Sequence, residues 1–341
     1  MKRRQLTRRS VHVSIAGGLA TLTAGCLGGG DDSECLDGGD NSEYDVIEVD
    51  PGEQRDIYVE DETFENTLID MTADNCTAKM EVDGNSTIQN VGWLGQPDYN
   101  DSGDFLMLIS GGGDVTVENC YMNGMGDGSP GTYHGGMYLS VGFSGHVEAR
   151  NNYIAGMGNN AFYANSPAQS NGGGGTIAFR NCFHENNTPS NFRPGATGST
   201  IENCLSIADD PNGERGRYFS SDYQFCRPIW HWDGTPMEVQ ETCLYVNPND
   251  VQPGAGFQVR NQHGDADHVQ LDALDCYVND DIPTLYDQQE IEGSADVSFT
   301  NLTSEPTATI LEDGGVPLSA EQAASGDRTY PDPFNEGIDP R

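Results

Sequence analysis

The feature that most constrains the fold is a short phrase that recurs along the chain. It reads Val-Thr-Val-Glu-Asn-Cys at residues 115–120 and returns seven more times in altered form. The polar residues before the Cys position, taken as anchors, are Asn90, Asn119, Asn151, Asn181, Asn203, Thr242, Asp275 and Asn301. Successive anchors are 22 to 39 residues apart. An average of roughly 30 residues is typical of a solenoid.

Each copy alternates apolar and polar residues, as in Val115 and Val117 against Thr116 and Glu118, and a period of two predicts a strand. The Asn tolerates the backbone angles of a bend, and its amide can bond the copy stacked above or below. The sequence therefore predicts an all-β, right-handed parallel β-helix of about eight or more coils with terminal caps. The alternative is a β-sandwich of short strands, which the recurring Asn-Cys corner disfavours.

The wording of these copies resembles the β-helix (PbH1) repeats of the pectate-lyase-like superfamily over about residues 60–305. The resemblance implies the fold. It assigns no activity by itself, because one fold hosts many kinds of site.

The charge of the chain is strongly negative, with 54 acidic residues against 16 basic ones and a formal net charge of −38. Such a surface repels itself and needs salt to screen it. With only two Lys, at 2 and 79, the composition resembles that of secreted proteins of salt-loving archaea. Repulsion also opposes binding to nucleic acid, so no nucleic-acid partner is expected.

The first 25 residues are predicted to be an export signal. Residues 7–11, Thr-Arg-Arg-Ser-Val, resemble a twin-arginine signal, and residues 22–26, Leu-Thr-Ala-Gly-Cys, resemble a lipobox. A transmembrane anchor is disfavoured, because the apolar run between them is too short to span a bilayer. We therefore expect lipidation at Cys26, a flexible tether over 26–43, and a position on the extracellular face of the membrane.

The β-helix is expected over 44–305, followed by an acidic, Pro-rich tail or cap over 306–341. A solenoid end exposes unpaired strand edges, so a cover is needed. Within the tail, a short helix over 319–324 is predicted, with Ser319 as its cap and Gln322 three residues later.

Five cysteines are predicted to hold the same place in successive copies: Cys120, Cys182, Cys204, Cys243 and Cys276. Stacked strands lie about 4.8 Å apart, within the range of a disulfide. Parallel side chains fit the disulfide torsion poorly, however, which favours buried thiols over disulfides. No metal-binding spacing such as Cys-x-x-Cys occurs, and no metal site is predicted.

A second strand precedes each copy and is predicted to present two outward columns. These are Met107, Leu139, Tyr163, Arg193, Trp230 and Gln258, and Ile109, Val141, Asn165, Gly195, Trp232 and Arg260. Aromatic rings stack on sugar faces, and Arg forks bind carboxylates or sulfates. The predicted substrate-binding residues are Tyr163, Arg193, Trp230, Trp232 and Arg260.

A catalytic interpretation requires two carboxylates, as in glycoside hydrolases, and Asp209, Asp210 and Asp233 are the candidates, with Glu185 nearby in sequence. The Asp pair resembles that of polygalacturonase-type hydrolases, but that family's Asn-Thr-Asp and Arg-Ile-Lys motifs are absent. A lyase would instead use Arg193 with His231, or Arg260 with His263, beside Ca²⁺. A hydrolase or a binding protein requires no cofactor.

The function predicted from the sequence is an extracellular, lipid-anchored β-helix protein that binds a polysaccharide or cell-surface glycan. Whether it also cleaves that polymer, as a hydrolase or lyase, is left open by the sequence. The alternatives are a non-catalytic adhesion or envelope-scaffold protein, and an aromatic–arginine face that docks the protein's own tail or another chain.

Overall fold

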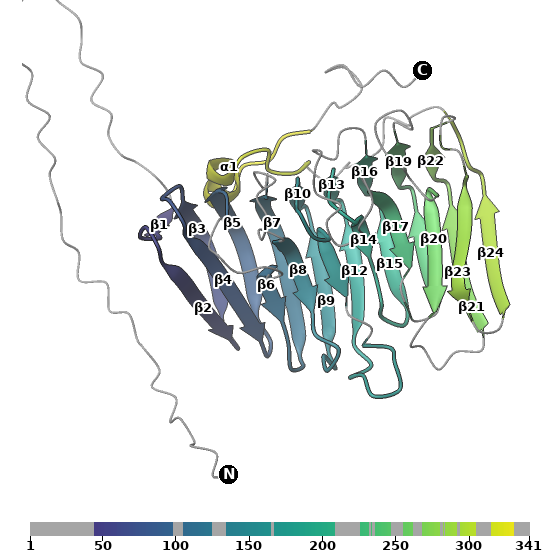
Figure 1. Ribbon diagram of the computed structural model, residues 1–341, viewed down its shortest axis with the longest axis horizontal. Coiled ribbons are helices and arrows are strands. Elements are labelled where there is room, and N and C mark those ends of the chain that lie inside the picture. Colours follow the sequence, from purple (N-terminus) through teal and green to yellow (C-terminus); the bar gives the residue numbers. More distant parts are fainter. Residues whose placement is uncertain are drawn as a thin grey trace, which may run out of the picture. The chain divides into compact units, whose positions relative to one another are not determined.

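The structure is a computed structural model and describes most of the chain after residue 43. The described residues are 44–97, 105–124, 134–164, 167–208, 226–231, 233, 236–246, 255–261, 268–279, 282, 284–291, 294–304 and 315–330. Their strands form two sheets in which every strand-to-strand pairing is parallel (Figure 1). Within these residues, no helix is long and apolar enough to cross a membrane.

The nine-stranded sheet runs in chain order, one strand for each coil. Its strands are β2 (Gln54–Glu60), β4 (Thr77–Asp83), β6 (Phe105–Ile109), β8 (Gly135–Leu139), β11 (Phe162–Ala164), β14 (Ser190–Arg193), β17 (Arg227–His231), β20 (Phe257–Asn261) and β23 (Tyr286–Ile291).

The fifteen-stranded sheet consists of two runs of strands that meet at one long strand. Its first part is β1 (Asp45–Glu48), β3 (Thr63–Met71), β5 (Thr87–Gly95) and β7 (Asp114–Asn123). One run continues as β9 (His146–Arg150), β12 (Thr176–Arg180), β15 (Ser199–Glu202), β18 (Met237–Gln240), β21 (His268–Leu274) and β24 (Ser294–Thr300). The other continues as β10 (Tyr153–Ala155), β13 (Phe183–Glu185), β16 (Leu205–Ala208), β19 (Cys243–Val246) and β22 (Tyr277–Val278).

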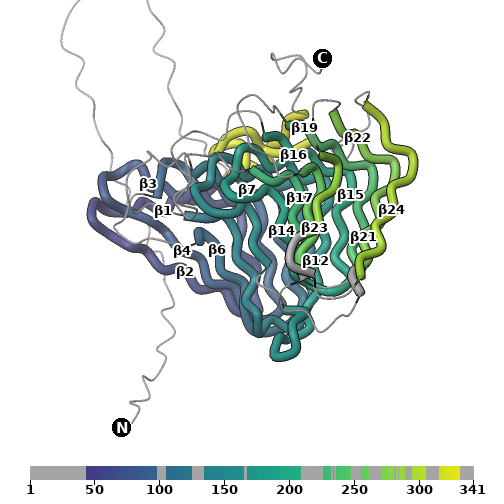
Figure 2. The backbone as a smooth tube through the Cα atoms, turned by 45° about the vertical axis from the view of Figure 1, so that its right-hand side comes forward, coloured from purple at the N-terminus to yellow at the C-terminus, as the bar shows by residue number. Residues whose placement is uncertain are grey.

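Successive coils lie side by side in chain order (Figures 1 and 2). One complete coil is β11, β12 and β13, each of which pairs with the corresponding strand of the next coil. The inward residues of these strands, such as Phe162, Ile177 and Phe179, are fully buried in one continuous apolar core. This arrangement confirms the parallel β-helix predicted from the repeats.

The recurring Asn forms the corner at which each coil bends between the two runs of the fifteen-stranded sheet. Asn119 has a φ of 54°, a left-handed value that Asn adopts more readily than most residues. Its Nδ2 donates to Asn90 Oδ1 at 2.8 Å, and Asn90 Nδ2 donates to Asn66 Oδ1 at the same distance. The predicted bonding between stacked copies is therefore confirmed.

One predicted anchor is wrong by a single residue. The pairing of β15 with β18 sets Ile201 beside Val239, which places Glu241, not Thr242, beside Asn203. Glu241 accordingly takes the positive φ of 47°, and Thr242 takes the Cys position. Cys243 then pairs with Leu205 and lies outside the cysteine column.

The five cysteines predicted for the column are buried thiols that form no disulfide, as the torsion argument favoured. Burial raises the pKa of the Cys120 thiol to about 12, so this thiol stays protonated and unreactive at neutral pH.

The described part of the tail, residues 315–330, is called the strap below. Its helix α1 (Ala320–Ser325) begins at Ser319, whose side chain accepts from Gln322 N, which confirms the predicted cap. Helix α1 packs on β3, β5 and β7, strands of the early coils (Figure 1). A Cβ at Gly92 would collide with the Ala320 carbonyl, so Gly permits this close approach.

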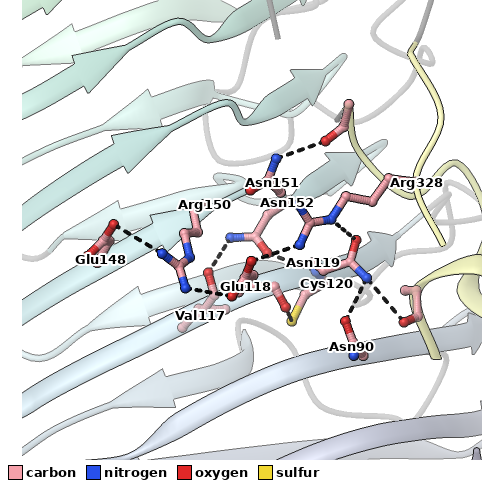
Figure 3. A network of polar contacts seen from close by, with 12 residues as sticks. Asn90, Val117, Glu118, Asn119, Cys120, Glu148, Arg150, Asn151, Asn152 and Arg328 are labelled. Carbon is pink, nitrogen blue, oxygen red and sulfur yellow. Dashed lines mark hydrogen bonds and ion pairs between the residues drawn. The ribbon is translucent and has the colours of Figure 1, made fainter. Parts of the chain in front are cut away.

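Polar contacts fix the strap to the Asn corner (Figure 3). Arg328 Nη2 lies 2.7 Å from Glu118 Oε1, while Arg150 Nη2 lies 2.7 Å from the other oxygen of the same carboxylate. Asn151 Nδ2 donates to the Gly315 carbonyl at 3.0 Å. The strap thus ties residues near the end of the chain to the early coils.

Candidate functional site

The side chains that point away from the core along the nine-stranded sheet form one line across the coils, called the outer column below. Strand register gives its members as Tyr58, Glu81, Leu108, Tyr138, Tyr163, Arg193, Trp230, Gln258 and Asp287. Their chain neighbours Phe162, Phe192 and Ile229 point into the core. Tyr163, Arg193, Trp230 and Gln258 therefore lie in one column, as the sequence predicted.

The first two predicted members of this column are wrong. Met107 and Leu139 are fully buried in the core, and Leu108 and Tyr138 take their places. The alignment of the early strands was off by one residue, and because side chains alternate, such a slip moves each one to the other face. Ile109, which was also predicted to point outward, is in the core for the same reason.

Arg193 lies between two aromatic rings of the outer column. Its Cζ is 3.8 Å from the centroid of the Tyr163 ring and 4.2 Å from that of the Trp230 ring. A second guanidinium, that of Arg227, lies 4.3 Å from the Trp230 ring. Cations at these distances are attracted by the negative faces of the rings. Arg227 was missed by sequence reasoning, although a basic residue three places before Trp230 in so acidic a chain was an available signal.

The stack is more buried than the sequence indicated. Only 7% of Arg193 and 3% of Trp230 is exposed, whereas both were expected on a solvent face. Tyr163, beside Arg193 in the column, and Arg260, two residues after Gln258 on β20, are half-buried. Solvent therefore meets the two flanks of the stack more than its centre.

The three arginines of this face act on one another electrostatically. The pKa of Arg193 is lowered from its ordinary value to about 10, chiefly by burial and also by the charges of Arg227 and Arg260, while Tyr163 and Asp233 act in the opposite direction. Burial likewise lowers the pKa of Arg227 to about 10, with Asp287 opposing. Both guanidiniums remain protonated at neutral pH. The face thus gathers positive charge in a chain of net charge −38.

A second feature of the face is a group of three rings, Phe105, Tyr138 and Tyr163, called the aromatic trio below. The ring centroids of Phe105 and Tyr138 are 5.0 Å apart, and those of Tyr138 and Tyr163 are 5.4 Å apart. All three side chains are half-buried. The slip of the early strands hid this trio from the sequence argument.

The predicted catalytic residues are only partly described. Asp233 is fully buried just after β17, and its charge acts on Arg193. Glu185 lies in a different sheet, in β13 of the fifteen-stranded sheet. Its carboxylate accepts a hydrogen bond from the Tyr153 hydroxyl at 2.9 Å. The predicted residues Asp209, Asp210, Trp232, His263 and Cys26 lie outside the described residues.

Two further findings bear on the chemistry of the face. Among the described residues, no group of three or more His, Cys, Asp or Glu side chains is placed to hold a metal ion. No protein-family model, curated protein or solved structure matches the chain. The fold and this face together define the class of protein, a parallel β-helix with an arginine–aromatic outer column.

Proposed function

We propose that the protein binds an acidic polysaccharide along the outer column of the nine-stranded sheet. The observation that carries the proposal is the stack of Arg193 between Tyr163 and Trp230, with the charges of Arg227 and Arg260 close by. Guanidinium groups donate in a fork that matches carboxylates and sulfates. The rings hold the Arg193 guanidinium in place, so little of its freedom is lost on binding.

The direction of the column supports a polymer as the ligand. Neighbouring strands are about 4.8 Å apart, and the column continues across nine strands. An extended chain laid across the coils would meet one side chain after another. A small ligand would use only one or two of them.

The charge of the chain supports an anionic ligand held by specific contacts. With a net charge of −38, the protein as a whole repels a polyanion, and only a local gathering of arginines can reverse that repulsion. Such binding should therefore depend on individual arginines. It requires no cofactor, and Ca²⁺ would enter only if the protein were a lyase.

We favour binding over cleavage. A glycosidase needs two carboxylates about 5 to 9.5 Å apart across its substrate. Asp233 is fully buried, and Asp209 and Asp210 lie outside the described residues, so the preference for binding rests on the arginine–aromatic stack. An adhesion or envelope-scaffold role fits binding without turnover.

The setting of this function is also part of the proposal. The signals that resemble a twin-arginine motif and a lipobox support export and lipid attachment at Cys26, which would hold the protein on the outer face of the membrane. The sequence of the repeats supports membership of the pectate-lyase-like superfamily, and the acidic composition supports a salt-loving archaeal source.

The test uses the chain without residues 1–25 and with Cys26→Ser. The salt concentration is one at which the protein is folded, as shown by a cooperative unfolding transition. The protein is incubated with a panel of neutral and acidic polysaccharides while binding, new reducing ends and unsaturated-product absorbance are followed. We expect binding to acidic polymers and no new ends. Binding to none of the polysaccharides would contradict the proposal. New reducing ends would show that the protein is an enzyme that cleaves the polymer.

A further inference from the structure

The face that contains the outer column has two parts with different chemistry. The aromatic trio lies on β6, β8 and β11. The arginine cluster, which we define as Arg193, Arg227 and Arg260, lies on β14, β17 and β20. Tyr163 belongs to the first part and touches the second through its contact with Arg193. A ligand laid across the coils meets rings first and positive charge afterwards.

The surroundings of the aromatic trio disfavour a negative charge there. Glu81 is exposed in the outer column two coils before Tyr138, about 10 Å away by strand spacing. Glu81 offers a carboxylate no positive partner, and the half-buried rings suit the apolar face of an uncharged sugar. This part of the column therefore selects a neutral sugar.

A carboxylate bounds the positive charge of the arginine cluster on the side away from the aromatic trio. Asp287 follows Gln258 in the outer column and accepts from Gln258 Nε2 at 3.2 Å. The positive charge is thus confined between the aromatic trio and a carboxylate. Arg260 is the half-buried member of the cluster, placed to meet a ligand from solvent, while Arg193 and Arg227 add charge from beneath.

We propose that the face binds a heteropolysaccharide, with a neutral sugar over the aromatic trio and an acidic sugar over the arginine cluster. From β8 to β20 there are four coil steps, or roughly 19 Å, so a ligand must be at least that long to use both parts. This inference rests on the proposed function and narrows it from acidic polysaccharides in general to chains that mix neutral and acidic units.

The experiment compares two acidic ligands of equal length by isothermal calorimetry. One alternates glucuronate with N-acetylglucosamine, and the other is galacturonate alone; a methyl-esterified galacturonate chain serves as the uncharged match. The variants are Tyr138→Ala, Tyr138→Phe and Arg260→Gln. Arg180→Gln is the control, because Arg180 lies in β12 of the other sheet and pairs with Glu202.

We expect the alternating chain to bind more tightly than galacturonate alone. Tyr138→Ala should weaken the alternating chain roughly three- to tenfold and leave galacturonate unchanged, and Tyr138→Phe, which keeps the ring, should bind as the parent does. Arg260→Gln should weaken both acidic ligands about tenfold. Arg180→Gln should change neither.

Two results overturn the inference alone. One is equal binding of the two acidic chains, and the other is an equal effect of Tyr138→Ala on both. In either case the proposed function survives, because acidic chains still bind. If no acidic chain binds, or if the esterified chain binds equally well, the proposed function fails and this inference fails with it. A calorimetric unfolding scan of each variant separates lost folding from lost binding.

Discussion

The arginines of this protein lie in two regions that use the same side chain differently. At the Asn corner, Arg150 and Arg328 both bind Glu118 at 2.7 Å, and Arg180 lies 3.0 Å from Glu202. On the outer column, Arg193 is stacked between Tyr163 and Trp230. An arginine whose fork is closed by a carboxylate serves the fold. One whose flat faces are covered by rings is held in the outer column, where we propose that its charge serves a ligand.

The comparison predicts that stability and binding can be changed separately. The largest effect should come from the strap, through deletion of residues 315–341 or, as a matched single change, Gly92→Ala. Both would detach Ala320 and Ala324 from Leu68 and Arg328 from Glu118. We expect deletion to lower the free energy of unfolding by on the order of 3 kcal/mol, measured by urea denaturation.

Under conditions in which both strap variants are fully folded, their glycan binding should be unchanged, because the strap packs on β3, β5 and β7. A large loss of binding in Gly92→Ala, with the protein still folded, would contradict the separation of the two regions.

The next largest effect should be on binding. Arg193→Met keeps the length and packing of the side chain between the two rings but removes its charge. Loss of charge-assisted contacts of about 2 to 3 kcal/mol should weaken the acidic ligand by roughly 30- to 150-fold. Calorimetry measures the binding, and urea denaturation of the same variant measures its free energy of unfolding. A large loss of stability together with intact binding would assign Arg193 to the fold instead.

A third prediction concerns the pH dependence of stability and His184. This residue lies in β13 and contacts β14 of the other sheet. Its ring stacks on Phe192 with centroids 4.1 Å apart, and its Nδ1 lies 3.0 Å from the Asn191 carbonyl oxygen. Burial lowers the pKa of His184 from 6.5 to about 3. Below pH 6.5 the unfolded chain takes up a proton that the folded chain refuses. The contribution to stability is therefore present above pH 6.5 and is lost as pH falls toward 3.

Between pH 6.5 and pH 5, this residue should lower the free energy of unfolding by roughly 2 kcal/mol. Other groups also titrate in this range, so the quantity to measure is the difference in pH slope between the parent and His184→Gln. Equal slopes would show that His184 gains its proton while the protein is folded.

The smallest effect should be that of Arg180→Gln. Half of the Arg180 side chain is exposed, at 51%, and its ion pair with Glu202 faces solvent. Exposed pairs contribute about 0 to 1 kcal/mol, so urea denaturation should show a loss below about 1 kcal/mol. A larger loss would mean that the corner arginines are more than local ion pairs.

Local features of the fold could be predicted from the sequence. The Asn corners depend on residues in the same or the next copy, and the cap of α1 depends on residues within one turn of that helix. Strand register was harder to predict where the sequence of a copy departs from the repeat. A one-residue slip misplaced Met107 and Leu139, and Glu241 replaced Thr242 because only the pairing of β15 with β18 decides between them.

Features that depend on distant parts of the chain could not be predicted. Arg328 meets Glu118 across 210 residues, and no local pattern indicates such a contact. The burial of Arg193 is likewise set by packing that a column of residues does not reveal. Sequence reasoning therefore placed Tyr163, Arg193, Trp230 and Gln258 in one column, but it missed Arg227 and the aromatic trio and expected more exposure than the structure shows.

The most direct test of the central claim compares Arg227→Gln on the outer column with Arg150→Gln at the corner. Each change removes one guanidinium charge, so their effects on net charge are identical. Binding of an acidic polysaccharide is measured by calorimetry at one salt concentration. Our account predicts that Arg227→Gln weakens binding at least tenfold and that Arg150→Gln leaves it unchanged. Equal loss in both variants would mean that overall charge governs binding, and no loss in either would exclude the outer column as the site.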